Sequence, residues 1–106
     1  MNFWVKNGEP ALFLAPMEGV TDAPMRTLLS EHGAFTHMVT EFLRVSQLVP
    51  PKRLFLRHMF EIRSQAKTKE GVPVILQILG GHPGRLAGTA ALAAQSGAKA
   101  IDLNFG

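Results

Sequence analysis

The sequence contains no cysteine, and none of its apolar runs approaches the length of a membrane span. The missing thiols exclude disulfides, thiolate metal sites and a cysteine nucleophile within these 106 residues. A spanning helix needs about 20 consecutive apolar residues, so the apolar runs present here predict a globular core. The opening segment, Met1–Lys6, also lacks the order of basic and then apolar residues that marks a secretory signal. These absences predict a cytoplasmic protein that does not contact a membrane.

Positive charge is concentrated in the middle of the chain. The net charge is +3, and seven of the eleven basic residues lie in a window where Glu61 is the one acid: Arg44, Lys52, Arg53, Arg57, Arg63, Lys67 and Lys69. This basic window either holds phosphates, with a binding that weakens as salt rises, or is an ordinary solvated surface. Phe55 and Phe60 are its only aromatic residues, which counts against stacking of single-stranded RNA. His37, His58 and His82, three of the four histidines, lack metal-ligand spacing, so we predict no metal site.

Four apolar segments of strand length alternate with three helical segments, a pattern typical of parallel α/β proteins. The predicted strands are Ala11–Ala15, Thr36–Phe42, Gly71–Gly81 and Ala98–Leu103, and the predicted helices are 23–32, 53–61 and 83–96. Each connection is long enough for a right-handed parallel crossover. We therefore predict one partial α/β domain, residues 1–106, that forms the N-terminal half (about four βα units) of a TIM (β/α)8 barrel.

Helical periodicity predicts which side chains of the first two helices face the core. The expected apolar faces are Met25, Leu28 and Leu29 on the first helix, and Leu54, Phe55, Met59 and Ile62 on the second. Arg26 and Glu31 then fall at the surface. Thr21 or Asp22 is expected to cap the first helix, with Pro24 in its first turn.

Several residues occupy strand ends, where parallel α/β folds bind their ligands. Pro16, Met17 and Glu18 follow the first predicted strand, and Glu41 lies at the end of the second. Gln77 is the single polar residue inside the most apolar predicted strand. Its side chain either bonds to neighbouring backbone or faces a ligand, because an unpartnered buried amide costs about 1–3 kcal/mol.

Four short segments resemble motifs of one enzyme family, in that family's order and spacing. They are LAPMEGVTD at 14–22, TEF at 40–42, LQILG at 76–80 and DLNFG at 102–106. Together they resemble the tRNA-dihydrouridine synthases, and the resemblance covers nearly the whole chain from Leu12 onward. The segment Glu41–Val45, with Gln47, Leu48 and Pro50 after it, most resembles the bacterial C-type subgroup.

The resemblance implies an FMN-dependent, NADPH-linked oxidoreductase that reduces uridine to 5,6-dihydrouridine in the tRNA D-loop. It does not indicate which D-loop uridine is the substrate. Family members have an FMN-binding barrel followed by a helical tRNA-binding domain, so we expect the C-terminal half-barrel and the helical domain to be absent here. A cytoplasmic, monomeric full-length enzyme that uses no metal and has tRNA as its partner is implied.

The family's functional residues map onto the strand ends. By the resemblance, Pro16 and Met17 lie against the flavin, Gln77 hydrogen-bonds the polar edge of the flavin, and Asn104 and Glu41 lie on the substrate side. The candidates for tRNA contact are Arg44, Arg53 and Arg57.

The chain ends one residue short of the family's general acid. Asn104 matches the asparagine of the motif Asn-X-Gly-Cys-Pro, whose cysteine protonates the substrate carbon next to the one that receives hydride. That cysteine would follow Gly106, so we expect no catalytic residue within the chain and no activity from the 106 residues alone.

Two other interpretations remain open. Another FMN barrel, such as a relative of dihydroorotate dehydrogenase, shares the general architecture, although the segment at 14–22 argues against it. An inactive truncated half-barrel could instead act as an RNA-binding or self-associating module, since half a barrel leaves two unpaired sheet edges.

Overall fold

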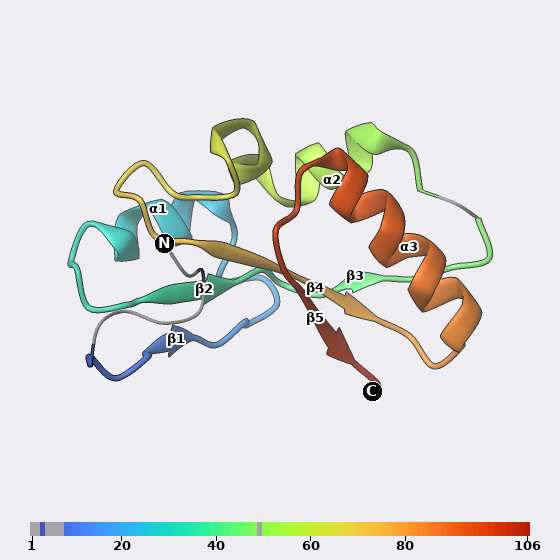
Figure 1. Ribbon diagram of the computed structural model, residues 1–106, viewed down its shortest axis with the longest axis horizontal. Coiled ribbons are helices and arrows are strands. Elements are labelled where there is room, and N and C mark those ends of the chain that lie inside the picture. The colour runs from blue at the N-terminus through green and yellow to red at the C-terminus, as the bar shows by residue number, and fades with distance from the viewer. Residues whose placement is uncertain (1–2, 4–7, 49) are drawn as a thin grey trace.

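A parallel sheet with its helices on one face forms the core of the molecule (Figure 1). The computed structural model describes residue 3, residues 8–48 and residues 50–106. Within these residues the sheet has five strands. The strands are β1 (Phe13–Leu14), β2 (His37–Val39), β3 (Leu43–Arg44), β4 (Val74–Leu79) and β5 (Ile101–Asn104). The helices are α1 (Ala23–Ser30), α2 (Lys52–His58), the 3₁₀-helix η1 (Phe60–Ser64) and α3 (Pro83–Ser96).

Strand β4 is the centre of the sheet because it pairs along both of its edges. One edge pairs first with β2 and then with β3, and the other edge pairs with β5. Strand β1 extends the sheet beyond β2, and every pair is parallel. Spatial order therefore follows chain order, as it does in the first half of a (β/α)8 barrel. The predicted α/β class is confirmed.

The predicted second strand, Thr36–Phe42, is wrong as a single continuous element. Pairing stops after β2 and resumes at β3, and the three residues 40–42 lie alongside only Leu76 and Gln77 of β4. One extra residue on this side interrupts the ladder in the manner of a β-bulge. Thr40 and Glu41 consequently sit inside the paired region and not at its end.

Local capping correctly predicts the start of α1 and both ends of α3, whereas α1 ends at Ser30, two residues before the predicted end. The Asp22 side chain accepts a hydrogen bond from the Met25 N–H at 3.0 Å and caps α1. Helix α3 matches its predicted range and ends at Gly97, whose φ of +122° suits glycine. The second predicted helix is split into α2 and η1, because Met59 between them has a non-helical φ of −128° and ψ of 86°. No helix among the described residues is long and apolar enough to cross a membrane.

The main core lies between the sheet and its helices. Alternate residues of β4 point toward the helices, where a buried cluster forms from Met38, Phe55, Met59, Ala66, Val74, Leu76, Ile78, Leu86, Ala93 and Ala98. The intervening residues of β4, Ile75 and Gln77, belong to the opposite face by strand alternation. There Ile75 packs with Val39, Ala100 and Phe3.

The predicted inward face of α1 is partly wrong. Leu28 is 52% exposed, whereas Arg26, expected at the surface, is only 1% exposed. The guanidinium of Arg26 can be buried because Glu61 of η1 accepts two hydrogen bonds from it, each 2.8 Å long. Apolar periodicity alone cannot indicate such a residue.

We expect Phe55→Ala to lower the free energy of unfolding by about 3–5 kcal/mol, because it leaves a cavity beneath α2. The matched control is Phe60→Ala, since Phe60 is 59% exposed while Phe55 is 0% exposed. The control should change stability by about 0.5 kcal/mol or less. Urea unfolding followed by circular dichroism measures both variants, and equal losses would contradict the described core.

Candidate functional site

Four separated segments come together toward the edge of the sheet at which the strands have their carboxyl ends. These are the loop after β1 (residues 15–22), residues 40–42 between β2 and β3, Gln77 of β4, and the end of β5. The same segments contain the four motifs found in the sequence. Register places Gln77 directly opposite Asp102. This edge is therefore the candidate site.

The loop after β1 is closed by hydrogen bonds between Met17 and Thr21. The Met17 N–H donates to the Thr21 hydroxyl oxygen at 2.8 Å, and the N–H groups of Val20 and Thr21 donate to the Met17 carbonyl at 3.0 Å. Gly19, with a φ of +80°, supplies the turn and donates its N–H to a carboxylate oxygen of Glu41. The backbone of Met17 is thus occupied within the loop, while its side chain is 59% exposed.

Gln77 is held by side chains of the neighbouring strand. Its Nε2 donates to Asp102 Oδ2 at 2.6 Å, and its Oε1 accepts from Asn104 Nδ2 at 3.4 Å. The partners of its side chain are therefore two side chains of β5 and not the backbone that one sequence interpretation proposed. A primary amide has a second N–H and a second lone pair, so Gln77 keeps capacity for one further donor and one further acceptor contact. The Asn104 side chain is itself fixed, because its Oδ1 accepts the Gly106 N–H at 2.9 Å.

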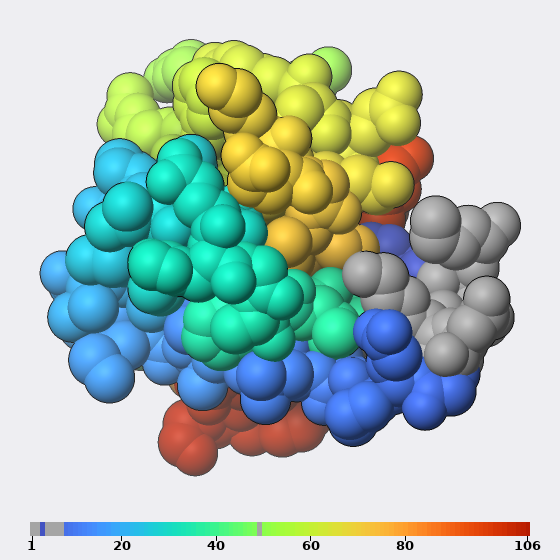
Figure 2. Space-filling view, turned by 90° about the vertical axis from the view of Figure 1, so that its left-hand side faces the viewer, coloured from blue at the N-terminus to red at the C-terminus, as the bar shows by residue number. Residues whose placement is uncertain are grey.

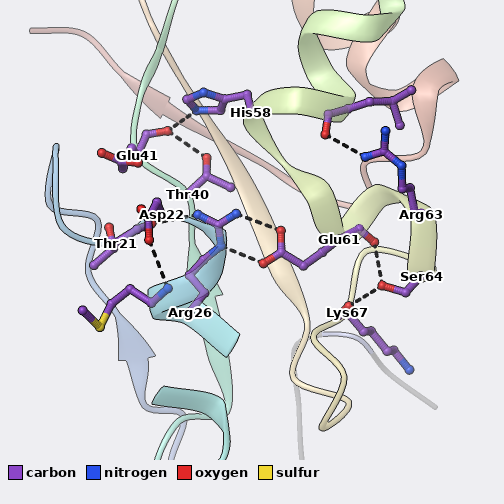
Figure 3. A network of polar contacts seen from close by, with 12 residues as sticks. Thr21, Asp22, Arg26, Thr40, Glu41, His58, Glu61, Arg63, Ser64 and Lys67 are labelled. Carbon is purple, nitrogen blue, oxygen red and sulfur yellow. Dashed lines mark hydrogen bonds and ion pairs between the residues drawn. The ribbon is translucent and has the colours of Figure 1, made fainter. Parts of the chain in front are cut away.

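Residues 40–42 are tied to three different elements, and Figure 3 shows the contact with His58 of α2. The Thr40 hydroxyl accepts the Gln77 N–H at 3.1 Å and donates to the Glu41 carbonyl at 2.9 Å. His58 of α2 donates from Nε2 to the same carbonyl at 2.6 Å. Glu41 therefore has a fixed backbone, and its carboxylate reaches the loop after β1 through Gly19.

A cleft of about 270 Å³ opens next to Glu41. It is lined by Asp22, Ala23, Pro24, Glu41, Leu54, Arg57 and His58. Arg57 is thereby brought beside one candidate substrate residue. Arg53 lies exposed on α2 and does not line this cleft, and the guanidinium of Arg44 lies 5.5 Å from the ring centroid of Phe42. Among the described residues, no three His, Asp or Glu side chains are grouped so as to hold a metal ion.

Three residues of this arrangement have roles that the sequence analysis missed. Asp102 holds the Gln77 amide, Thr40 joins β4 to the interrupted strand, and Arg26 donates from Nη1 to the Thr21 carbonyl at 2.8 Å. Asp102 and Thr40 each lie within a recognised motif, which was a usable signal. Arg26 had one weaker signal, because its partner Glu61 is the one acid of the basic window.

Comparison with known proteins assigns the chain to a family. Residues 13–106 match the family described as Dihydrouridine synthase (Dus). The chain belongs to the dihydrouridine synthase family. Its resemblance to that family is thus confirmed, and the alternative of a dihydroorotate dehydrogenase relative is not supported.

Relatives within the family are similar over most of this chain. The tRNA-dihydrouridine(16) synthase of Vibrio vulnificus is 47% identical over 95 residues, and that of Azotobacter vinelandii is 48% identical over 93 residues. The synthase of the same name from Pseudomonas syringae pv. tomato is 45% identical over 93 residues. These matches cover 88–90% of this chain but only 29–30% of each relative. The chain therefore spans less than a third of the length of these dihydrouridine synthases.

We expect Thr40→Val to destabilise this family member by about 1–3 kcal/mol, because the change leaves the buried Gln77 N–H without an acceptor. Thr40 is 0% exposed, and valine preserves its branched shape. The matched control is Thr27→Val on the half-buried side of α1, which should be nearly neutral. Thermal unfolding of both variants measures the difference. An unchanged midpoint for Thr40→Val would contradict the bridging role of its hydroxyl.

Proposed function

We propose that the chain carries part of the flavin- and uridine-binding site of a tRNA-dihydrouridine synthase. The supporting observation is the cluster of Gln77, Asp102 and Asn104, which the carboxyl-terminal halves of β4 and β5 bring together with the family's motifs around it. The proposed reaction is the FMN-dependent, NADPH-linked reduction of uridine to 5,6-dihydrouridine in tRNA. The relatives are named for position 16, and we propose the same position for the enzyme that contains these residues.

The described residues fit a flavin. An isoalloxazine ring needs an apolar surface and a few oriented polar groups. Pro16 and the exposed side chain of Met17 supply the apolar surface, and Gln77 supplies its spare N–H and lone pair. When bound, FMN supplies the hydride that NADPH replenishes. The role of these residues is to hold and orient the ring.

Two further residues, Asn104 and Glu41, are proposed to contact the substrate uridine. Asn104 presents an amide that is fixed at both ends, by Gly106 and by Gln77, and that suits the polar edge of uracil. Glu41 uses one carboxylate oxygen to hold Gly19, which leaves the other for a substrate hydroxyl or N–H. Fixed donors and acceptors orient a substrate without losing conformational freedom on binding.

The basic window is proposed to bind the tRNA backbone. All seven of its Lys and Arg residues are exposed, whereas Glu61 is 4% exposed and is paired internally with Arg26. Arg44, Arg53 and Arg57 are the candidate contacts, and Arg57 lines the cleft beside Glu41. Phosphate contacts of this kind position RNA without reading its sequence.

We also propose that the 106 residues alone do not complete the reaction. In the family that the chain resembles, the general acid is a cysteine, and this sequence contains no cysteine. The functional test therefore uses a chimera, in which this chain replaces the stretch that it matches in the Vibrio vulnificus relative. Dihydrouridine in tRNA, measured by mass spectrometry in cells that lack their own synthases, should appear with the chimera and not with the chain alone.

Within the chimera, Gln77→Ala should lower the affinity for FMN about tenfold, because one net hydrogen bond to the ring is worth about 1–1.5 kcal/mol. Gln95→Ala, on the exposed side of α3, is the matched control and should bind FMN normally. Quenching of FMN fluorescence measures the affinity, and circular dichroism verifies the fold. Equal affinities for the two variants would remove Gln77 from the flavin site.

Arg57→Ala and Arg44→Ala should weaken tRNA binding and reduce its salt dependence, while NADPH oxidation by the flavin stays unchanged. Each lost phosphate contact lowers the slope of log affinity against log salt by about 0.7–1. The control is Arg85→Ala, an exposed arginine of α3 outside the basic window. If affinity and slope match those of the control, the basic window is ordinary solvated surface.

A further inference from the structure

Among the described residues, Arg26 is the most deeply buried charged residue that the proposed chemistry does not use. Its side chain is 1% exposed and that of Glu61 is 4% exposed. Nε and Nη2 donate to the two carboxylate oxygens of Glu61 at 2.8 Å each, while Nη1 donates to the Thr21 carbonyl at 2.8 Å. Figure 3 shows the guanidinium between the loop after β1 and η1. The ion pair thus takes two of the five guanidinium N–H groups, and a loop carbonyl takes a third.

The Thr21 carbonyl belongs to the same turn that presents Met17. The Thr21 hydroxyl and N–H both bond to the backbone of Met17, so a fixed Thr21 fixes Met17 as well. A continuous set of contacts therefore runs from Glu61 through Arg26 and Thr21 to Met17. Its last member is the backbone of Met17, the residue whose side chain offers apolar surface at the candidate site.

The segment α2–η1 holds this loop by two routes. Glu61 acts through Arg26, and His58 bonds the Glu41 carbonyl, while the Glu41 carboxylate takes the Gly19 N–H. Glu61 is itself fixed, because its carbonyl accepts the Ala66 N–H at 2.9 Å. In the space-filling view, α1 (cyan) and η1 (yellow) lie side by side (Figure 2).

Stability alone does not require an ion pair at this position. A well-packed apolar pair of similar volume is often as stable as a buried ion pair, because burying the two charges removes their hydration. An apolar pair cannot donate a hydrogen bond to the Thr21 carbonyl. The feature that only the arginine supplies is therefore the anchor on the loop.

We propose that Arg26 is a positioning residue, which Glu61 orients so that it holds the Met17–Asp22 loop in the conformation that receives the flavin. The anchoring of the loop follows from the contacts of the chain, and its effect on flavin binding rests on the proposed function. Arg26 touches neither ring nor substrate in this role.

The decisive variant is Arg26→Met/Glu61→Met, which removes both charges and keeps apolar bulk. On the 106-residue chain we expect an unfolding midpoint only slightly below that of the unmodified chain, because the two buried charges are removed together and only the Thr21 carbonyl loses its donor. Amide exchange in residues 17–21 should become about tenfold faster, while exchange in β4 stays unchanged. In the chimera, FMN affinity should fall several-fold. Arg85→Met, an exposed arginine of α3, is the control and should alter none of these.

A second variant covers the case in which the double variant does not fold. Arg26→Lys keeps the charge opposite Glu61, but an ammonium lacks the planar fork that reaches the carboxylate and the carbonyl together. It should also give faster loop exchange with β4 protected. Normal loop exchange in either folded variant would overturn the proposal. Fast loop exchange with FMN affinity unchanged would overturn its flavin part, and absence of FMN binding by the unmodified chimera would refute the proposed function instead.

Discussion

The pairing of β4 along both edges is the constraint on which the candidate site depends. Parallel register fixes Gln77 opposite Asp102 on one side. On the other side the ladder is interrupted, and the Thr40 hydroxyl accepts the Gln77 N–H where a backbone carbonyl would otherwise do so. The interruption thus leaves no buried donor unpaired at this point, and it releases Glu41 to reach the loop after β1. A regular second strand would not have placed these groups at one edge.

The polar groups at this edge also stabilise one another. No buried side-chain nitrogen or oxygen among the described residues lacks a hydrogen-bond partner. Each such group would otherwise cost about 1–3 kcal/mol, so the network selects a single arrangement of the loop, the interrupted strand and β5. The buried side chains of Arg26 and Glu61 also have hydrogen-bond partners, and both of these side chains are charged. Rigid presentation of a few polar groups is what a site that orients a planar ring requires.

The sequence predicted those elements whose signals are local. Strand β4 is an apolar, β-branched run between glycines, and α3 lies between Pro83 and Gly97, so both appear close to where they were expected. Gln77 stood out because it is polar within that run. Two features could not be predicted in this way. Arg26 pairs with Glu61, which lies 35 positions further along the chain. The role of Thr40 depends on the one-residue shift between the pairing of β2 with β4 and that of β3 with β4, which exists only in the assembled sheet.

The burial of Glu61 changes the charge that the basic window presents to solvent. Counted along the sequence, seven positive charges oppose one negative charge. In the folded chain that acid is paired with Arg26, which lies outside the window, so all seven positive charges act at the surface without internal compensation. Their field extends about 8 Å into physiological salt and attracts a polyanion without distinguishing one sequence from another. Under the proposed function, selection of a uridine is the task of fixed polar groups such as Asn104 and Glu41, and the loop that Arg26 holds connects the two surfaces because α2 and η1 carry contacts to both.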